Sequence, residues 1–368
     1  MRRTTSDETT RVLVVDDSAL MRKVLVGFFE KHAQFSVQAA RNGVQALQML
    51  EEFCPHVITM DINMPEMDGL TALSEIMVRR PTPVIMVSSL TSKDALPTFE
   101  ALALGAVDFV AKPGGTVSMD MHKVEREIIQ KVAAARSARA GAPQKSNGVK
   151  ARVAGRGTQR AVSESQVQQW ALHPSMVVVG VSTGGPRTLE AILPLLPSDF
   201  AHPVLVAIHM PGTFTGAFAK RMAQLCELPV QEVERQTDLK PGTIYIGKGD
   251  LDMIVAKRGG RMVVMSTPPD PGALWHPCVD RLLESAMRHV SCNALLGVQL
   301  TGMGNDGVEQ MKALHTMGGV TIAESEETAV VFGMPRMLIE CRGASLVLPA
   351  TAIGGQINSW ANQLERAS

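Results

Sequence analysis

This sequence of 368 residues has few aromatic residues, no excess of positive or negative charge and no long apolar run. Aromatics make up 4% of the chain and hydrophobic residues 45%, so its cores must be aliphatic and Met-rich, as in parallel sheets covered by helices. Lys plus Arg equal Asp plus Glu at 36 each, which argues against nucleic acid as the main partner. No apolar run reaches the roughly 18 residues that a membrane span needs, so we expect no membrane insertion.

The five cysteines are scattered, with no C-x-x-C pair and no cluster of histidines beside them. This pattern predicts neither a zinc site nor a disulfide framework. The segment before Arg11 is polar and charged, unlike a secretory leader. Together these features predict a cytoplasmic protein.

A chain of this length fits two domains and a connector. In the first third, short apolar runs alternate with stretches of helical period, which predicts an α/β fold with a parallel five-stranded sheet covered on both faces. The expected strands are Val12–Val15, Phe35–Ala39, Val57–Met60, Pro83–Val87 and Val107–Val110. Such sheets place functional residues at the carboxyl ends of their strands.

The middle of the chain, from the helix that ends near Arg136 to about His173, is rich in Ala, Gly, Ser, Gln and Arg. Because it has few large apolar residues to bury, we expect a flexible or weakly helical linker. Its basic residues could alternatively bind an anion. The expected boundaries are 10–133 for the first domain, 134–174 for the linker and 175–368 for the second domain.

In the second domain, short apolar runs again alternate with stretches of helical period, which predicts a doubly wound, mostly parallel sheet. Three short apolar runs lie close together between Gly, Asp and Lys residues and indicate a local antiparallel elaboration. These runs are Ile244–Ile246, Met253–Ala256 and Met262–Met265. The other expected strands are Met176–Val181, Pro203–Ile208, Ala294–Leu300, Val320–Ala323 and Ser345–Leu348, and the expected helices are Pro186–Leu196, Gly216–Cys226, Val279–Val290 and Gly307–Met317.

Three carboxylates and a lysine follow strands of the first domain. Asp16 and Asp17 close the first strand, Asp61 the third and Lys112 the fifth, so all should meet at one edge. Clustered carboxylates repel one another unless a cation such as Mg²⁺ lies among them. A D-D pair taken alone is more often a surface turn or a helix cap.

The joint pattern is more specific: D-D-S, D-I-N-M-P-E-M-D-G, V-S-S and K-P follow strands one, three, four and five. With these motifs, residues 10–133 resemble the receiver domain of two-component response regulators, which implies a flavodoxin-like α/β fold. The resemblance implies that Asp61 is the phospho-acceptor, that Asp16, Asp17, Asp61 and the Asn63 carbonyl hold Mg²⁺, and that Ser88 and Lys112 form the phosphorylation switch.

The second domain opens with a strand that runs into Gly180-Val181-Ser182-Thr183-Gly184. This G-x-S-x-G spacing is typical of a nucleophile elbow, in which small residues permit the tight turn that exposes a serine hydroxyl. Pro186 suits the first turn of the helix that follows. Alternatively, such a glycine-rich turn could bind phosphate.

A nucleophilic serine needs a base and an orienting carboxylate. His209 directly follows the strand Pro203–Ile208, at the edge where Ser182 should lie, and His276 in W-H-P-C is the rival base. Asp306 lies in the glycine-rich turn L-T-G-M-G-N-D-G; it could instead cap the next helix. The order Ser, His, Asp is acceptable because a triad is defined by geometry and roles.

These segments resemble the chemotaxis methylesterase (CheB) family through G-V-S-T-G-G-P, H-M-P, P-G-T-I-Y-I, T-G-M-G-N-D-G and V-F-G-M-P-R. The resemblance implies that Ser182, His209 and Asp306 are the catalytic triad, with Thr183 and Met303 beside the reacting carbonyl and no metal at this site. It also implies demethylation of glutamate methyl esters, and deamidation of glutamines, on chemoreceptors, with a chemotaxis histidine kinase as phosphodonor.

Two segments depart from the family pattern. His276 to Asp280 read H-P-C-V-D where R-P-S-V-D is usual, and the segment after Tyr245 lacks an expected proline and histidine. One alternative is a response regulator whose second domain only binds a partner, and another is a DNA-binding regulator. The intact Ser, His and Asp argue against the first, and the neutral charge balance against the second.

Overall fold

A computed structural model describes residues 9–88, 95–112, 118–136 and 162–367. The chain divides into two compact units, Met1–Lys145 and Ser146–Ser368. Most of the predicted linker, residues 137–161, lies outside the described residues, so the linker boundaries stay a prediction. Within the described residues, no helix is long and apolar enough to cross a bilayer.

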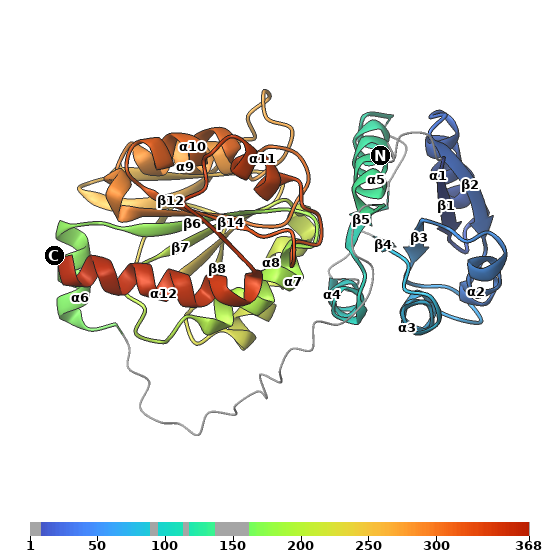
Figure 1. Cartoon of the computed structure of the whole chain (residues 1–368), viewed down its shortest axis with the longest axis horizontal. Helices are drawn as coiled ribbons and strands as arrows, with labels where there is room; N and C mark the ends of the chain where they lie inside the picture. The colour runs from blue at the N-terminus through green and yellow to red at the C-terminus, as the bar shows by residue number, and fades with distance from the viewer. Residues whose placement is uncertain (1–8, 89–94, 113–117, 137–161, 368) are drawn as a thin grey trace, which may run out of the picture. The chain divides into compact units, whose positions relative to one another are not determined.

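The first unit is a parallel five-stranded sheet in the order β2-β1-β3-β4-β5, which confirms the predicted fold. Helices α1 and α5 cover one face, and α2, α3 and α4 cover the other (Figure 1). The strands are β1 (Thr10–Val15), β2 (Phe35–Ala40), β3 (Val57–Asp61), β4 (Val84–Ser88) and β5 (Asp108–Ala111). The helices are α1 (Ala19–Glu30), α2 (Gly43–Glu52), α3 (Gly69–Arg79), α4 (Ala95–Leu104) and α5 (Ser118–Ala135).

The second unit contains a parallel seven-stranded sheet in the order β15-β14-β13-β6-β7-β10-β8, and a small antiparallel sheet in the order β11-β12-β9. The large sheet consists of β6 (Met176–Val181), β7 (Val204–Ile208), β8 (Val230–Val233), β10 (Ile244–Gly247), β13 (Leu295–Gln299), β14 (Val320–Glu324) and β15 (Leu346–Leu348). The small sheet consists of β9 (Thr237–Asp238), β11 (Asp252–Arg258) and β12 (Arg261–Thr267).

The assignment of Ile244–Ile246 to the antiparallel elaboration is wrong. These residues form β10, which pairs in parallel with β7 and β8 in the large sheet. Every residue of β10 is buried, because the strand lies between two neighbours and beneath helices. A short, wholly apolar run is typical of such a strand, and its closeness in sequence to β11 concealed its partner.

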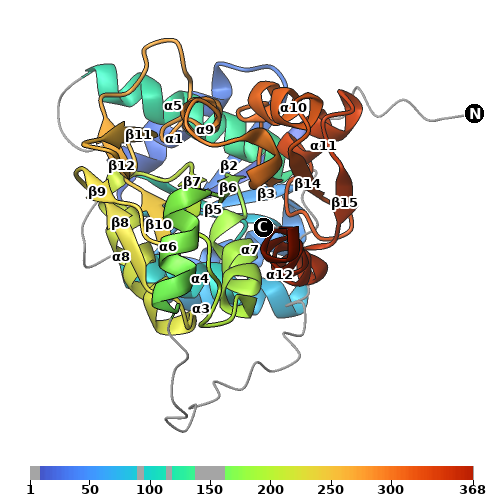
Figure 2. The same ribbon diagram turned by 90° about the vertical axis from the view of Figure 1, so that its left-hand side faces the viewer.

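Helices cover both faces of the large sheet (Figure 2). On one face lie α9 (Val279–Met287) and α10 (Val308–Thr316), with α11 (Met334–Glu340) beside α10. On the other lie α7 (Gly185–Ile192), which continues as a 3₁₀ turn to Leu195, α8 (Gly212–Leu225) and α12 (Ala350–Ala367). The helix α6 (Glu164–Leu172) falls inside the range predicted as linker, and its Trp170 is buried and donates to the Ser175 carbonyl.

Candidate active site and phosphorylation site

The turn between β6 and α7 carries Ser182. β6 is buried along its whole length, and Ser182 follows its last residue. The Gly185 N–H donates to the Ser182 carbonyl at 2.7 Å, which closes the turn. Gly184 has a φ of +79°, and a Cβ there would lie 2.5 Å from the Val330 side chain. The turn therefore requires glycine at this position, both for its backbone angle and for the contact with Val330.

The imidazole of His209 lies on the neighbouring turn. β6 and β7 pair in parallel with Val181 opposite Ile208. The His209 N–H continues this register by donating to the Val181 carbonyl at 3.0 Å. Ser182 and His209 therefore lie opposite each other, one residue beyond the paired ends of β6 and β7. This is the carboxyl edge of the sheet, where the sequence predicted them.

Asp306, on the turn between β13 and α10, reaches the same edge. Its Oδ2 lies 2.8 Å from His209 Nε2 and accepts the Val279 N–H at 2.7 Å. Its Oδ1 accepts the N–H of Asp280 at 3.1 Å and the thiol of Cys278 at 3.2 Å. Burial raises the pKa of Asp306, but the hydrogen bond and charge of His209 and the amides of α9 outweigh it, so the pKa lies below its usual value.

The structure thus brings together the three residues predicted as a triad. His209 Nδ1 is buried and has no hydrogen-bond partner among the described residues, which leaves it available to the serine hydroxyl. Thr183, the residue after Ser182, is also buried, and its hydroxyl has no hydrogen-bond partner within the same described ranges. Gly302, next to Met303, packs so closely on Ser182 that a Cβ there would lie 2.7 Å from the Ser182 Cβ.

His276, the rival base, is bound elsewhere. Its Nδ1 lies 2.8 Å from Oδ1 of Asp252, a fully buried carboxylate that also accepts from the guanidinium of Arg281 and the N–H of Cys278. Burial raises the pKa of Asp252, but these donors outweigh it and lower the pKa overall. His276 therefore organises the loop before α9.

Sequence reasoning missed the contact that this loop makes with His209. The indole of Trp275 stacks on the imidazole with ring centroids 5.6 Å apart and an interplanar angle of 13°. A buried carboxylate at the start of an apolar strand, Asp252, was the available signal for an organised loop. The spacing of residues along the sequence does not indicate the contact between Trp275 and His209.

A second Ser–His pair lies at the opposite edge of the sheet. Ser175 Oγ and His202 Nδ1 are 2.6 Å apart, and they precede β6 and β7 respectively. Burial lowers the pKa of His202 to about 4. This pair lacks the glycine-rich turns of the carboxyl edge and is consistent with a structural role.

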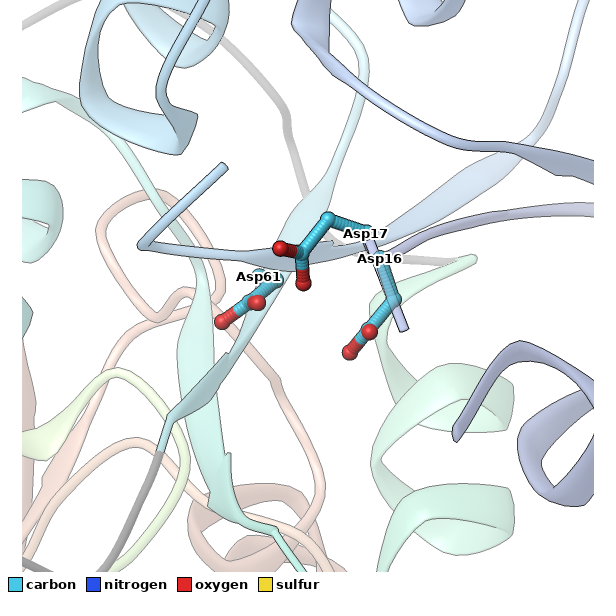
Figure 3. Close-up of side chains that lie close together, drawn as sticks. All are labelled: Asp16, Asp17 and Asp61. Carbon is cyan, nitrogen blue, oxygen red and sulfur yellow. The ribbon is translucent and has the colours of Figure 1, made fainter. Parts of the chain in front are cut away.

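In the first unit, Asp16, Asp17 and Asp61 come together at the carboxyl ends of β1 and β3 (Figure 3). One ligand oxygen from each lies within 4.8 Å of the others. Asp16 and Asp61 are buried, and Asp17 is exposed. Lys112 Nζ lies 2.6 Å from Asp61 and 2.9 Å from Asp16. The cluster predicted from the sequence is therefore present.

The residues around this cluster raise the pKa of Lys112 and shape the loop behind Asp61. Burial lowers the pKa of Lys112, but hydrogen bonds and charges from Asp61 and Asp16 outweigh it, so its pKa is raised. Ser88 is buried at the end of β4, whereas Asn63 is exposed on the loop after Asp61. A Cβ on Gly69 would lie 2.0 Å from the Asp61 carbonyl oxygen, so glycine is required behind Asp61.

Comparison with known proteins agrees with this geometry. Residues 177–357 match the family model described as CheB methylesterase, and residues 12–121 match the response regulator receiver domain. The chain is 51% identical to protein-glutamate methylesterase/protein-glutamine glutaminase 3 of Rhodospirillum rubrum, over 95% of this chain and 96% of that one. A second relative of this name, from Caldanaerobacter subterraneus, is 44% identical over 97% and 98% of the two chains.

A solved structure is also similar, the CheB methylesterase catalytic domain of Thermotoga maritima. It is 39% identical, covers 50% of this chain and 96% of its own, and superposes with a TM-score of 0.48. The two family models and the relatives that align along nearly the whole length identify the chain. It belongs to the receiver-linked CheB family of protein-glutamate methylesterases/protein-glutamine glutaminases.

Proposed function

We propose that this chain hydrolyses glutamate methyl esters, and the side-chain amides of glutamines, on methyl-accepting chemoreceptors under the control of receiver phosphorylation. The observation that carries the proposal is the 2.8 Å contact between His209 and Asp306 on turns beside Ser182. Membership of the family supplies the substrate class. The proposed location is the cytoplasm, where a histidine kinase would serve as phosphodonor.

In the proposed reaction Ser182 Oγ attacks the ester carbonyl carbon while His209 Nδ1 takes the hydroxyl proton. The tetrahedral intermediate collapses, the bond to the methoxy oxygen breaks, and His209 returns the proton to form methanol. Water then adds to the acyl-enzyme with His209 again as base, which releases the glutamate carboxyl group and regenerates Ser182. Asp306 orients the imidazole and stabilises its protonated form.

Thr183 and Met303 flank the reacting carbonyl in this proposal. The buried Thr183 hydroxyl has no other partner within the described residues, so it is free to donate to the oxygen that becomes negative. Donors held in place before the reaction stabilise this charge without reorganising. The N-terminus of α7, directly after the nucleophile, adds a favourable dipole.

In the receiver, Asp61 is the proposed phospho-acceptor. Three carboxylates with ligand oxygens within 4.8 Å fit a hard divalent cation. Asp16, Asp17, Asp61 and the Asn63 carbonyl would hold Mg²⁺, which when bound would neutralise charge on the phosphoryl group. Lys112 would contact that group, and the Ser88 hydroxyl would respond to it as the switch.

We further propose that the unphosphorylated receiver restricts access to Ser182 and that phosphorylation weakens this restriction by shifting the population of receiver conformations. The domains would be those predicted from the sequence: a receiver at 10–133, a linker at 134–174 and a catalytic domain at 175–368. This coupling is supported by the presence on one chain of the carboxylate cluster around Asp61 and of Ser182, His209 and Asp306 at one edge of a sheet.

The test is methanol release from membranes that carry methylated receptors, measured with and without a small phosphodonor. The full-length chain should release methanol, and the phosphodonor should raise the rate. Asp61→Asn should remove the response to the phosphodonor. Asp68→Asn is the matched control, because Asp68 only caps α3 on the same loop and asparagine caps equally well. A chain that releases no methanol under either condition would overturn the proposal.

A further inference from the structure

One buried threonine ties the nucleophile turn to the turn that carries Asp306. Thr301 is fully buried directly after β13 and Leu300. Its carbonyl accepts the Ser182 N–H at 2.9 Å. Its hydroxyl lies 2.9 Å from the Thr183 carbonyl and 3.4 Å from that of Val331, so the single hydroxyl proton goes mainly to Thr183. Thr301 thus holds the backbone on both sides of the Ser182-Thr183 pair.

The third polar group of Thr301, its N–H, is held by a buried carboxylate. Glu324, at the end of β14, is fully buried, and its Oε2 accepts the Thr301 N–H at 2.8 Å. Its Oε1 accepts the hydroxyl of Thr328 at 2.9 Å. The Val331 N–H donates to the Thr301 hydroxyl at 2.9 Å. Every polar group of Thr301 is therefore occupied, and its position is fixed from three sides.

We propose that Thr301, held by Glu324, is a positioning residue of the esterase, an inference that rests on the proposed function. Its hydroxyl fixes the peptide between Thr183 and Gly184, and so the placement of Thr183 beside the nucleophile. Thr301 itself is buried beneath the turn and touches no substrate. Displacement of a catalytic group by about 1 Å can cost roughly 10²-fold in rate, so the loss of this bond should lower kcat.

The chain offers a matched control on the neighbouring strand. Thr321, in β14, is also fully buried, and its hydroxyl donates to the Gly343 carbonyl at 2.6 Å and accepts the Ser345 N–H at 2.9 Å. This is the same pattern of one donated and one accepted backbone bond, directed toward β15 instead of Ser182. A purely structural role for Thr301 predicts equal effects at both positions.

The experiment compares full-length Thr301→Val, Thr301→Ser and Thr321→Val by methanol release and thermal unfolding. Thr301→Val should lower kcat by roughly 10²-fold with KM within about twofold, and Thr301→Ser, which keeps the hydroxyl, should restore most of the rate. Thr321→Val should lose comparable stability but keep kcat within about twofold, because the hydroxyl of Thr321 is bonded toward β15 and not to the turn that carries Ser182 and Thr183. Unchanged kcat in Thr301→Val, or an equal loss in Thr321→Val, would overturn the positioning role.

Two variants of Glu324 keep the inference testable if Thr301→Val does not fold. Glu324→Gln retains an acceptor for the Thr301 N–H and should stay close to wild type in kcat, whereas Glu324→Leu removes the acceptor and should lower kcat. Equal rates in these two variants would contradict the inference. An inactive wild-type chain would instead overturn the proposed function, so the two failures are distinguishable.

Discussion

His209 meets Asp306 through Nε2, at 2.8 Å, and not through Nδ1. Nδ1 is the buried ring nitrogen that has no hydrogen-bond partner in the described ranges. In the proposed mechanism the neutral imidazole would carry its proton on Nε2 and offer the Nδ1 lone pair to Ser182. Asp306 would favour this tautomer by accepting the Nε2 proton, and its own position is set by the amides at the start of α9.

Asp306→Asn should lower kcat by roughly 10⁴-fold, because an amide can donate to Nε2, favours the wrong tautomer and cannot stabilise the imidazolium. The amide nitrogen would replace Oδ2, so the Val279 N–H would lose its acceptor, but the remaining oxygen can still accept the Asp280 N–H. The unfolding temperature should therefore fall, but the chain should still fold. Methanol release and thermal unfolding check the two expectations. Near-normal turnover in a folded Asp306→Asn chain would remove Asp306 from the triad.

His209→Gln and His276→Gln separate the two candidate bases. His209→Gln should abolish esterase activity, because glutamine cannot take the serine proton at neutral pH. His276→Gln loses a contact with Asp252 but leaves the carboxylate its bonds from Arg281 and Cys278, so its activity should fall by less. The comparison is made on kcat for methanol release. A larger loss from His276→Gln would mean that the base is misassigned.

Glu324 should make the stability of the second unit depend on pH. Burial raises its pKa from 4.5 to about 7 despite the bonds from Thr301 and Thr328. The folded state therefore binds more protons than the unfolded state between these values, and stability falls as pH rises from about 4.5 through 7, by an amount on the order of 3 kcal/mol. All three tryptophans lie in the second unit, so their fluorescence reports its unfolding alone.

Glu324→Gln cannot ionise and is the matched variant for this measurement. Urea unfolding followed at pH 5 and pH 8 should show a smaller pH dependence in Glu324→Gln than in wild type, with the difference concentrated above pH 5. An identical pH dependence in both chains would show that Glu324 is ionised in the folded protein at all these pH values.

Removal of residues 1–145 should raise basal esterase activity if the receiver restricts access to Ser182. Allosteric coupling of ordinary strength corresponds to a rate increase of about 5-fold to 150-fold. The esterase rate of full-length Asp61→Asn should stay at the basal value and should not rise when a phosphodonor is added. A truncated chain no faster than the unphosphorylated parent would contradict inhibition by occlusion and favour activation by recruitment.

Much of the site could be predicted because its residues follow apolar strands. Ser182, His209 and Asp306 each come directly or shortly after a buried run, and parallel strands bring such positions to one edge. The place of β10 could not be predicted, because an apolar run of three residues, Ile244–Ile246, carries no information about its partner strand. The contact of Trp275 with His209 and the pairing of Thr301 with Glu324 depend on register between distant segments, which spacing does not reveal.

The central claim is that Ser182 is the nucleophile, and methanol release by Ser182→Ala tests it most directly. Ser175→Ala is the matched control, because it removes a serine hydroxyl at the opposite end of β6, where Ser175 contacts His202. Ser182→Ala should fold normally and release no methanol above the uncatalysed rate, while Ser175→Ala should remain active. Near-normal release by Ser182→Ala, or loss of activity only in Ser175→Ala, would contradict the assignment.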